Sequence, residues 1–266
     1  MASDSVGAAF PGRYEIKYHV NDPQARAIAE AIRPYCDLDP MAGESGYTIS
    51  TLYLDSPDRK LYWEKKLLCA CRTKARVRTY GMQSDGPVFV ELKKRFNDVG
   101  VKPRASVPPQ AWQAVLDPAG DALVASWGLK DSRLRVVEEF RAFCLLWNLG
   151  PLVVVRYDRL PFVGRFDKGL RITLDRGLRC RPASRLEIPK DDRGFVFFDD
   201  HERFASTDSR VILEIKYDLR YPLWVQDLVR RFDLWRESFS KFANSVDRIQ
   251  DLGYTGWSDL QRPTFG

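Results

Sequence analysis

The sequence predicts an α+β fold in which about eight antiparallel strands form a closed β-barrel tunnel with peripheral helices. Three observations lead to this prediction. Short segments of alternating apolar and polar residues recur along the chain and are separated by turn residues. Helical patterns are inserted between these segments or follow them, which favours a barrel over a doubly wound sheet. Basic residues recur at a spacing of two within the segments, so one face of the predicted sheet is charged.

The first half of the chain predicts a strand, a helix and then a meander. Residues 13–20 alternate as a strand, and a helix capped by Asn21 or Asp22 continues to about Arg33. Segments rich in Thr, Tyr, Val and Ile predict further strands at 46–54, 72–80, 87–95 and 99–107. A short helix toward Lys66 follows the first of these strands.

The second half of the chain begins with a change of pattern. Residues at about 108–148 have helical spacing, and we expect this insertion to pack outside the sheet. Strands resume at 151–158, 160–166, 169–176 and 210–218, and two helices at about 223–235 and 239–252 complete the fold. We therefore expect one domain over residues 13–252, between a flexible N-terminal tail at 1–12 and a C-terminal tail at 253–266.

Composition excludes several classes of function. The net charge of +6 comes from 42 Lys and Arg against 36 Asp and Glu, an excess too small to predict nucleic-acid binding. The five cysteines form no CxxC pair, and nothing ahead of Arg13 resembles a secretory leader. No apolar run reaches the roughly 18 residues of a membrane span. We expect a soluble, cytoplasmic protein with reduced thiols.

Acidic and basic residues share one face of several predicted strands. In RVILEIKYD, Glu214 and Lys216 lie on the face opposite to Ile215, and VFVELKKR repeats the pattern with Glu91 and Lys93. A single pair of this kind is usual on a solvated strand, but its repetition indicates a charged interior. Arg and Lys hydrogen-bond phosphate oxygens, so such a lumen suits a polyanion such as a triphosphate.

Carboxylates near these cations are candidate metal ligands. Phosphoryl transfer uses a divalent cation that bridges phosphate oxygens, and carboxylates are its preferred protein ligands. Glu214 is the first candidate, and Glu91 and Glu15 are alternatives that could instead orient a neighbouring cation. Asp175 could act in the same way. We expect a divalent cation as the cofactor.

Signatures of other chemistries are weak. The chain has no Walker A sequence, no glycine-rich dinucleotide loop and no HExxH. The two histidines, His19 and His201, do not favour a histidine metal site, and we interpret both as incidental. Tyr80 and Phe96 are the evident aromatic candidates among the basic groups, so base stacking on a nucleic acid has little support.

An ordered series of motifs resembles the VTC domain, the polyphosphate polymerase branch of the triphosphate tunnel metalloenzymes. The related CYTH branch opens with ExExK, whereas this chain has Arg13, Glu15 and Lys17 at those three positions, which favours the VTC branch. The resemblance covers most of residues 13–252 and rests on RYEIKYHV, TISTLYLDSPDRKLYWEK, KARVRTYG, VFVELKKR, VVRYDRLPFVG, LRITLDRGL, VILEIKYD and SKFANSVDRI.

The resemblance implies a polymerase, dependent on Mn²⁺ or Mg²⁺, that transfers the terminal phosphate of a nucleoside triphosphate to a growing inorganic polyphosphate chain, with ATP as the expected donor. Glu214 would be the metal ligand, and Tyr53 and Asp55 could help at the rim of the tunnel. The matching phosphate-binding and catalytic positions are Lys17, Arg76, Arg78, Lys93, Arg156, Arg159, Arg171, Lys216 and Lys241.

Two alternatives share the same predicted tunnel, because a fold does not fix a reaction. One is a tripolyphosphatase or nucleoside triphosphatase, in which water replaces the polymer end. The other is a non-catalytic sensor of polyphosphate. Eukaryotic relatives act in membrane complexes, so a separate membrane partner is compatible with the resemblance, although no residue of this chain specifies one.

Overall fold

The computed structural model describes residues 14–82, 86–97, 99–198, 210–218 and 221–253. His201, Arg13, the predicted tail at 1–12 and all but the first residue of the predicted tail at 253–266 lie outside these residues. The predicted domain boundaries therefore stay a prediction. Within the described residues, none of the helices combines the length and the apolar character that a membrane span requires.

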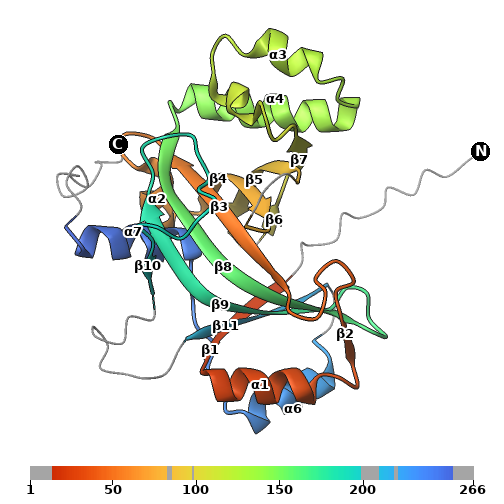
Figure 1. Ribbon diagram of the computed structural model, residues 1–266. Helices are drawn as coiled ribbons and strands as arrows, with labels where there is room; N and C mark the ends of the chain where they lie inside the picture. The colour runs from red at the N-terminus through yellow and green to blue at the C-terminus, as the bar shows by residue number, and fades with distance from the viewer. Residues whose placement is uncertain (1–13, 83–85, 98, 199–209, 219–220, 254–266) are drawn as a thin grey trace, which may run out of the picture.

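The described strands form one antiparallel sheet of 11 strands (Figure 1). The main path runs β1-β11-β9-β8-β3-β4-β5-β6, while β10 pairs with β9, β2 with β8 and β7 with β5. The strands are β1 (Tyr14–Val20), β2 (Cys36–Leu38), β3 (Tyr47–Asp55), β4 (Cys71–Tyr80), β5 (Val88–Phe96), β6 (Val99–Val101), β7 (Arg104–Val107), β8 (Gly150–Gly164), β9 (Arg171–Pro182), β10 (Val196–Phe197) and β11 (Val211–Tyr217).

The prediction of a closed barrel is wrong, because the sheet is open between β1 and β5. The edge of β1 that does not pair with β11 is covered by the segment after α6 (Leu223–Arg231). Tyr18 forms a bridge with Arg236, and the Glu237 amide donates to the Lys17 carbonyl at 3.0 Å. The outer edge of β5 is occupied by β6 and β7. Both edges therefore already have backbone partners, and closure would have to displace them.

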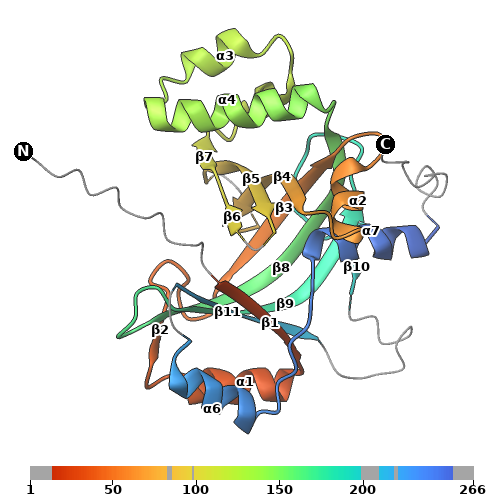
Figure 2. The same ribbon diagram turned by 180° about the vertical axis from the view of Figure 1, so that it is seen from behind.

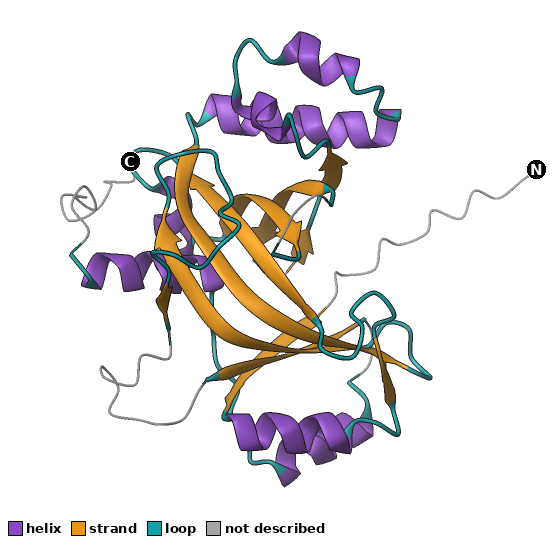
Figure 3. Ribbon diagram, in the orientation of Figure 1, coloured by secondary structure: helices purple, strands orange, loops and turns teal. Residues whose placement is uncertain are grey.

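Helices cover the sheet at its two ends (Figures 2 and 3). At one end lie η1 (Trp112–Leu116), α3 (Asp121–Ser126) and α4 (Asp131–Leu146), and at the other lie α1 (Asp22–Ala31) and α6 (Leu223–Arg231). Asn21 begins α1 with a capping box, since its side chain accepts from the Gln24 amide and the Gln24 side chain accepts from the Asn21 amide. Beside the sheet, α2 (Lys60–Lys66) contacts α7 (Lys241–Asp251).

Several elements differ from their predicted extents. The expected strands at 151–158 and 160–166 are one continuous strand, β8, and the expected strand at 99–107 is divided into β6 and β7. β9 continues to Pro182, beyond the predicted end at 176. Pro161 does not end β8, because β3 pairs with β8 only as far as Arg159. The missing amide of the proline therefore costs no hydrogen bond to β3.

The two faces of the sheet differ in chemistry. On the outer face near β1, β9 and β11, apolar side chains such as Ile172, Leu213 and Ile215 pack with α1 and α6 in one core cluster. A second core cluster includes residues of β3, β4, β5 and β8 together with α4 and α7. The opposite face of β1, β4, β5, β9 and β11 carries the charged residues, so burial of the apolar face directs the charges inward.

A β-bulge in β9 changes which of its residues face the inner side. The register with β8 shifts between Arg156 and Asp158, and Gly177 lies in the bulge with a φ of +54°. After the shift, Leu178 and Cys180 face inward, as Asp175 does before it. Glycine suits this position because a left-handed φ is unfavourable for residues with a Cβ.

Candidate active site

Glu214 on β11 is the centre of a buried ion cluster. The residue is 4% exposed, and its carboxylate lies 2.7 Å from the Lys216 Nζ and 3.5 Å from the Lys17 Nζ. The antiparallel register places Lys17 of β1 directly opposite Glu214 and Glu15 opposite Lys216. Lys17 also contacts Glu15 at 3.0 Å. Neighbouring strands therefore alternate positive and negative side chains around Glu214.

A helix and two further strands complete the Glu214 cluster. The Lys241 Nζ, at the start of α7, lies 2.7 Å from Glu214 and 2.6 Å from Asp175 of β9. Arg159 of β8 holds Asp175 with two hydrogen bonds of 2.7 Å and reaches Glu214 at 3.3 Å. Ser240 begins α7 as its N-cap, so the cap fixes where Lys241 enters the cluster.

A second cluster surrounds Glu91 on β5, which is fully buried. Arg76 of β4 contacts its Oε2 at 2.6 Å, and Arg78 lies 3.9 Å from the same oxygen. Lys102 and Arg104, from the hairpin of β6 and β7, each lie 3.2 Å from its Oε1. Four cations thus surround one carboxylate, which leaves positive charge unbalanced.

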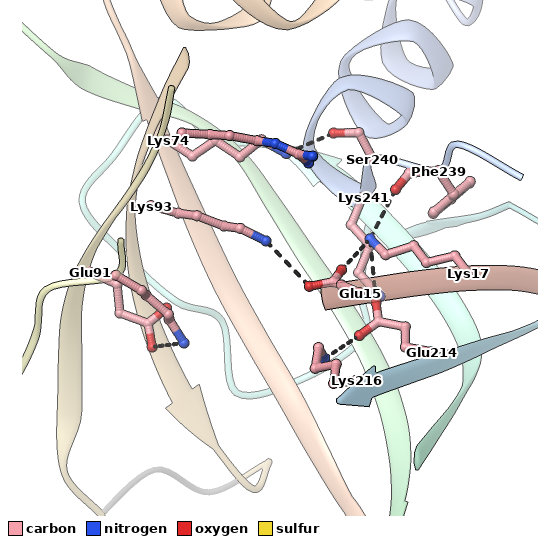
Figure 4. Close-up of polar contacts among 12 residues, drawn as sticks. Glu15, Lys17, Lys74, Glu91, Lys93, Glu214, Lys216, Phe239, Ser240 and Lys241 are labelled. Atoms are coloured by element: carbon pink, nitrogen blue, oxygen red, sulfur yellow. Dashed lines mark hydrogen bonds and ion pairs between the residues drawn. The ribbon is translucent and has the colours of Figure 1, made fainter. Parts of the chain in front are cut away.

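The two clusters meet across the open side of the sheet (Figure 4). Lys93 of β5 lies 3.5 Å from Glu15 of β1, and this ion pair spans the gap between the two strands. Lys74 of β4 donates to the Ser240 hydroxyl at 2.9 Å. We call the combined set the cationic cluster. Its cations are Lys17, Lys74, Arg76, Arg78, Lys93, Lys102, Arg104, Arg159, Lys216 and Lys241, and its carboxylates are Glu15, Glu91, Asp175 and Glu214.

The positive charges keep these carboxylates ionised. Burial alone would raise the pKa of Glu214, but Lys216, Lys241 and the neighbouring cations hold that pKa well below its usual range. Burial is likewise outweighed at Glu91 by Arg76 and Arg78, and its pKa is lowered. The pKa values of Glu15 and Asp175 are lowered in the same way.

Three lysines of the cationic cluster show the opposite effect, because burial and neighbouring cations outweigh the anions near them. Burial lowers the pKa of Lys93 to about 8. Burial, together with the nearby charge of Arg76, lowers the pKa of Lys102 to about 7. Burial and the charge of Lys93 also place the pKa of Lys74 well below its usual range. An added anion would therefore favour the charged form of each lysine.

A family match covers most of the chain. The family described as the VTC domain matches residues 12–249. The chain belongs to the VTC domain family. No curated protein matches the sequence. The membership supports a triphosphate-tunnel type of fold and an enzyme of phosphate chemistry.

Solved structures similar to this VTC domain include two candidate adenylate cyclases. The protein from Vibrio parahaemolyticus has 12% identity and a TM-score of 0.44, and the match covers 87% of this chain and 95% of that one. The protein from Bacillus halodurans has 13% identity and a TM-score of 0.45, with coverage of 89% and 98%.

Most of the predicted site residues of the VTC domain lie in the cationic cluster, but two do not. Arg156 is on the opposite face of β8, where it bonds the Ser50 hydroxyl, the Asp192 carboxylate and the carbonyls of Pro189 and Asp191. It fixes the loop after β9. Arg171 lies at the far end of the inner face and pairs with Asp39 at 3.2 Å.

Lys74, Lys102 and Arg104 are members of the cationic cluster that sequence reasoning missed. Lys74 extends the spacing of two in KARVR by one step, so the pattern could have identified it. Lys102 and Arg104 gave no such signal. They reach Glu91 because β7 pairs with β5 and Arg104 lies directly opposite Glu91. The pairing of a short hairpin is not evident from residue spacing.

Of the three predicted metal ligands, Glu15 and Glu214 lie near each other and Glu91 lies apart. Among the described residues, no group of three His, Cys, Asp or Glu side chains is arranged to hold an ion. Glu91 is separate from Glu15 and Glu214, which share Lys17 as a partner. Mg²⁺ commonly binds one or two carboxylates and completes its shell with substrate phosphates and water. Glu15 and Glu214 fit that mode.

The lowered lysine pKa values predict that phosphate binding takes up protons. Free Lys93 and Lys102 lose charge between pH 7 and pH 9, whereas bound triphosphate stabilises their charged forms and raises their pKa values. We expect tripolyphosphate affinity to fall about tenfold between pH 7 and pH 9. Calorimetry at pH 8 in two buffers of different ionisation enthalpy should show net proton uptake.

The control for this pH dependence is the Lys93→Met, Lys102→Met double variant. The titration of the ligand itself is the same for both proteins, so the difference between them reports the two lysines. The variant should bind more weakly at pH 7 and take up fewer protons. Equal proton uptake by the two proteins would contradict the assignment of the pH dependence to these lysines.

Proposed function

We propose that this VTC domain is a metal-dependent polyphosphate polymerase that uses a nucleoside triphosphate as its phosphate donor. A terminal oxygen of the polyphosphate chain attacks the γ-phosphorus of the donor. The bond between that phosphorus and the β–γ bridging oxygen breaks, and the nucleoside diphosphate leaves. The chain gains one phosphate, and no covalent intermediate with the protein is required.

The cationic cluster carries the proposal. It brings ten basic side chains against four carboxylates, and the arginines offer planar forks for phosphate oxygens. Net positive charge in a buried site is unfavourable without an anion, so the site is complementary to a chain of phosphates. Glu15 and Glu214 would hold a divalent ion, which neutralises charge on the phosphate oxygens when it is bound.

The state of the carboxylates favours a phosphate acceptor over water. A general base for water needs a pKa near the working pH, but the four carboxylates in the cationic cluster have lowered pKa values. Bound phosphate would also favour the protonated form of the lysines, which cannot accept a proton. A polyphosphate end is already an anion and needs no base, so positioning and charge neutralisation suffice for its attack.

The test is incubation of the purified protein with ATP and Mn²⁺ or Mg²⁺, with and without a short polyphosphate primer. Products are separated on a gel, and free phosphate is measured in parallel. Long chains that depend on the metal would support the polymerase. Free phosphate without chains would instead identify a tripolyphosphatase or nucleoside triphosphatase. Tight polyphosphate binding without either product would identify a sensor.

A further inference from the structure

A cavity of about 340 Å³ adjoins the cationic cluster. Its walls include His19 of β1 and Ile212 of β11, which lie opposite each other in the strand register. Each is two residues from a member of the cluster, Lys17 or Glu214, on the same face of its strand. Two residues of a strand span roughly 7 Å, so the cavity begins where the cationic cluster ends.

The lining of this cavity differs in chemistry from the cationic cluster. It includes the phenyl rings of Phe198 and Phe239, and its three carboxylates, of Glu237, Asp247 and Asp251, outnumber two arginines. Lys66 pairs with the Asp247 carboxylate, so the lining carries little net charge and offers a polyphosphate chain no excess of cations. An uncharged aromatic group with hydrogen-bonding atoms is complementary to this lining, and the volume is at the lower end for ligand sites.

His19 adds a hydrogen-bonding nitrogen that has no partner within the described part of the chain. Its Nδ1 lies 2.8 Å from the Glu237 carboxylate, which can only accept, so Nδ1 carries the proton. Burial lowers the pKa of His19, and Arg210, Lys241 and Lys17 act in the same direction against Glu237. Its Nε2 is then an acceptor, and it is buried with no hydrogen-bond partner among the described residues. A hydroxyl or amino donor of a ligand would complete it.

We propose that this cavity binds the nucleoside of the phosphate donor and thereby sets the direction of the reaction. The nucleoside lies at the His19 end, its triphosphate passes Lys17 and Glu214, and the polyphosphate chain extends toward the Glu91 end. The strongly basic Glu91 end has the charge for a chain of phosphates, and the cavity does not. The inference rests on the proposed function, since it assigns one part of the same substrate.

The test is Phe239→Ala, measured with two probes that differ by the nucleoside. We expect the Kd for ATP to rise about tenfold because a ring that can stack on the base is lost, while the Kd for tripolyphosphate stays within twofold. The substitution leaves intact the Phe239 carbonyl that accepts from Lys17 at 3.0 Å. A loss of tripolyphosphate binding therefore cannot be attributed to that hydrogen bond.

Two further variants complete the design. Phe239→Trp retains a stacking surface and should keep ATP affinity near the wild-type value. Phe166→Ala makes the same change at a side chain that is 83% exposed, and it should alter neither ligand. Equal losses for ATP and tripolyphosphate in Phe239→Ala, or no loss for either, would overturn the nucleoside site alone. Failure of the wild-type protein to bind tripolyphosphate would overturn the proposed function and this inference together.

Discussion

Replacement of Glu214 by glutamine is expected to lower turnover by at least about a thousandfold, while tripolyphosphate binds at least as tightly as before. Glu214 is contacted by Lys17, Arg159, Lys216 and Lys241 within 3.5 Å. The glutamine side chain carries no charge, so it can neither bind a metal ion as a carboxylate does nor offset the repulsion among these cations. Loss of one partner from a buried ion pair costs about 3–5 kcal/mol of folding free energy. A bound polyanion would offset that loss.

The measurements for Glu214→Gln are steady-state turnover, tripolyphosphate affinity and the unfolding temperature with and without ligand. The ligand should raise the unfolding temperature more in the variant than in the wild type. Glu187→Gln is the matched control, because it makes the same chemical change at an exposed side chain. Turnover within tenfold of the wild type would exclude Glu214 as a metal ligand or as the organising charge of the site.

Replacement of Arg78 by glutamine is expected to weaken tripolyphosphate binding about a hundredfold. It should lower the stability of the fold less than replacement of Arg76 or Arg159 would. Arg76 and Arg159 are held by carboxylates at 2.6–2.7 Å, whereas the carboxylate that pairs with Arg78 is Glu91 at 3.9 Å. Its Nε donates to the Thr51 hydroxyl at 3.2 Å. Its fork is therefore less committed to protein carboxylates than those of Arg76 and Arg159. Loss of two charged hydrogen bonds to phosphate corresponds to about this factor.

Arg156→Gln is the matched control for Arg78→Gln, because both arginines are buried and they lie on opposite faces of the sheet. The Arg156 variant loses the contacts that fix the loop after β9, so it should unfold at a lower temperature. Its tripolyphosphate affinity, measured below that temperature, should match the wild type. Equal weakening of binding in the two variants would contradict the assignment of faces.

Residue spacing alone predicts the charged face of most strands, since alternation on β1, β4, β5 and β11 follows directly from it. The predicted set of Lys17, Arg76, Arg78, Lys93, Lys216 and Glu214 therefore agrees with the cationic cluster. Arg156 does not join the cationic cluster, because it lies three residues before Arg159, and residues three apart on a strand face opposite sides. Ser50 beside Arg156 and Asp175 beside Arg159 mark these two faces.

The open sheet could not be predicted in the same way. Strand alternation defines faces, but it does not define which edges meet. The edge of β1 is covered by residues near Arg236 that have no strand pattern, and the edge of β5 is taken by the short β6 and β7. Closure depends on these long-range backbone hydrogen bonds, which leave no local periodicity in the sequence.

The bulge at Gly177 determines which side chains of β9 face the charged side of the sheet. Before Gly177, odd-numbered residues such as Asp175 face the charges, and after it the even-numbered Leu178 and Cys180 take the inner side. Because Asp175 and Cys180 are separated by an odd number of positions, they share the inner side only through the extra residue at the bulge. Removal of that extra residue would restore regular alternation and would keep both side chains on the inner side.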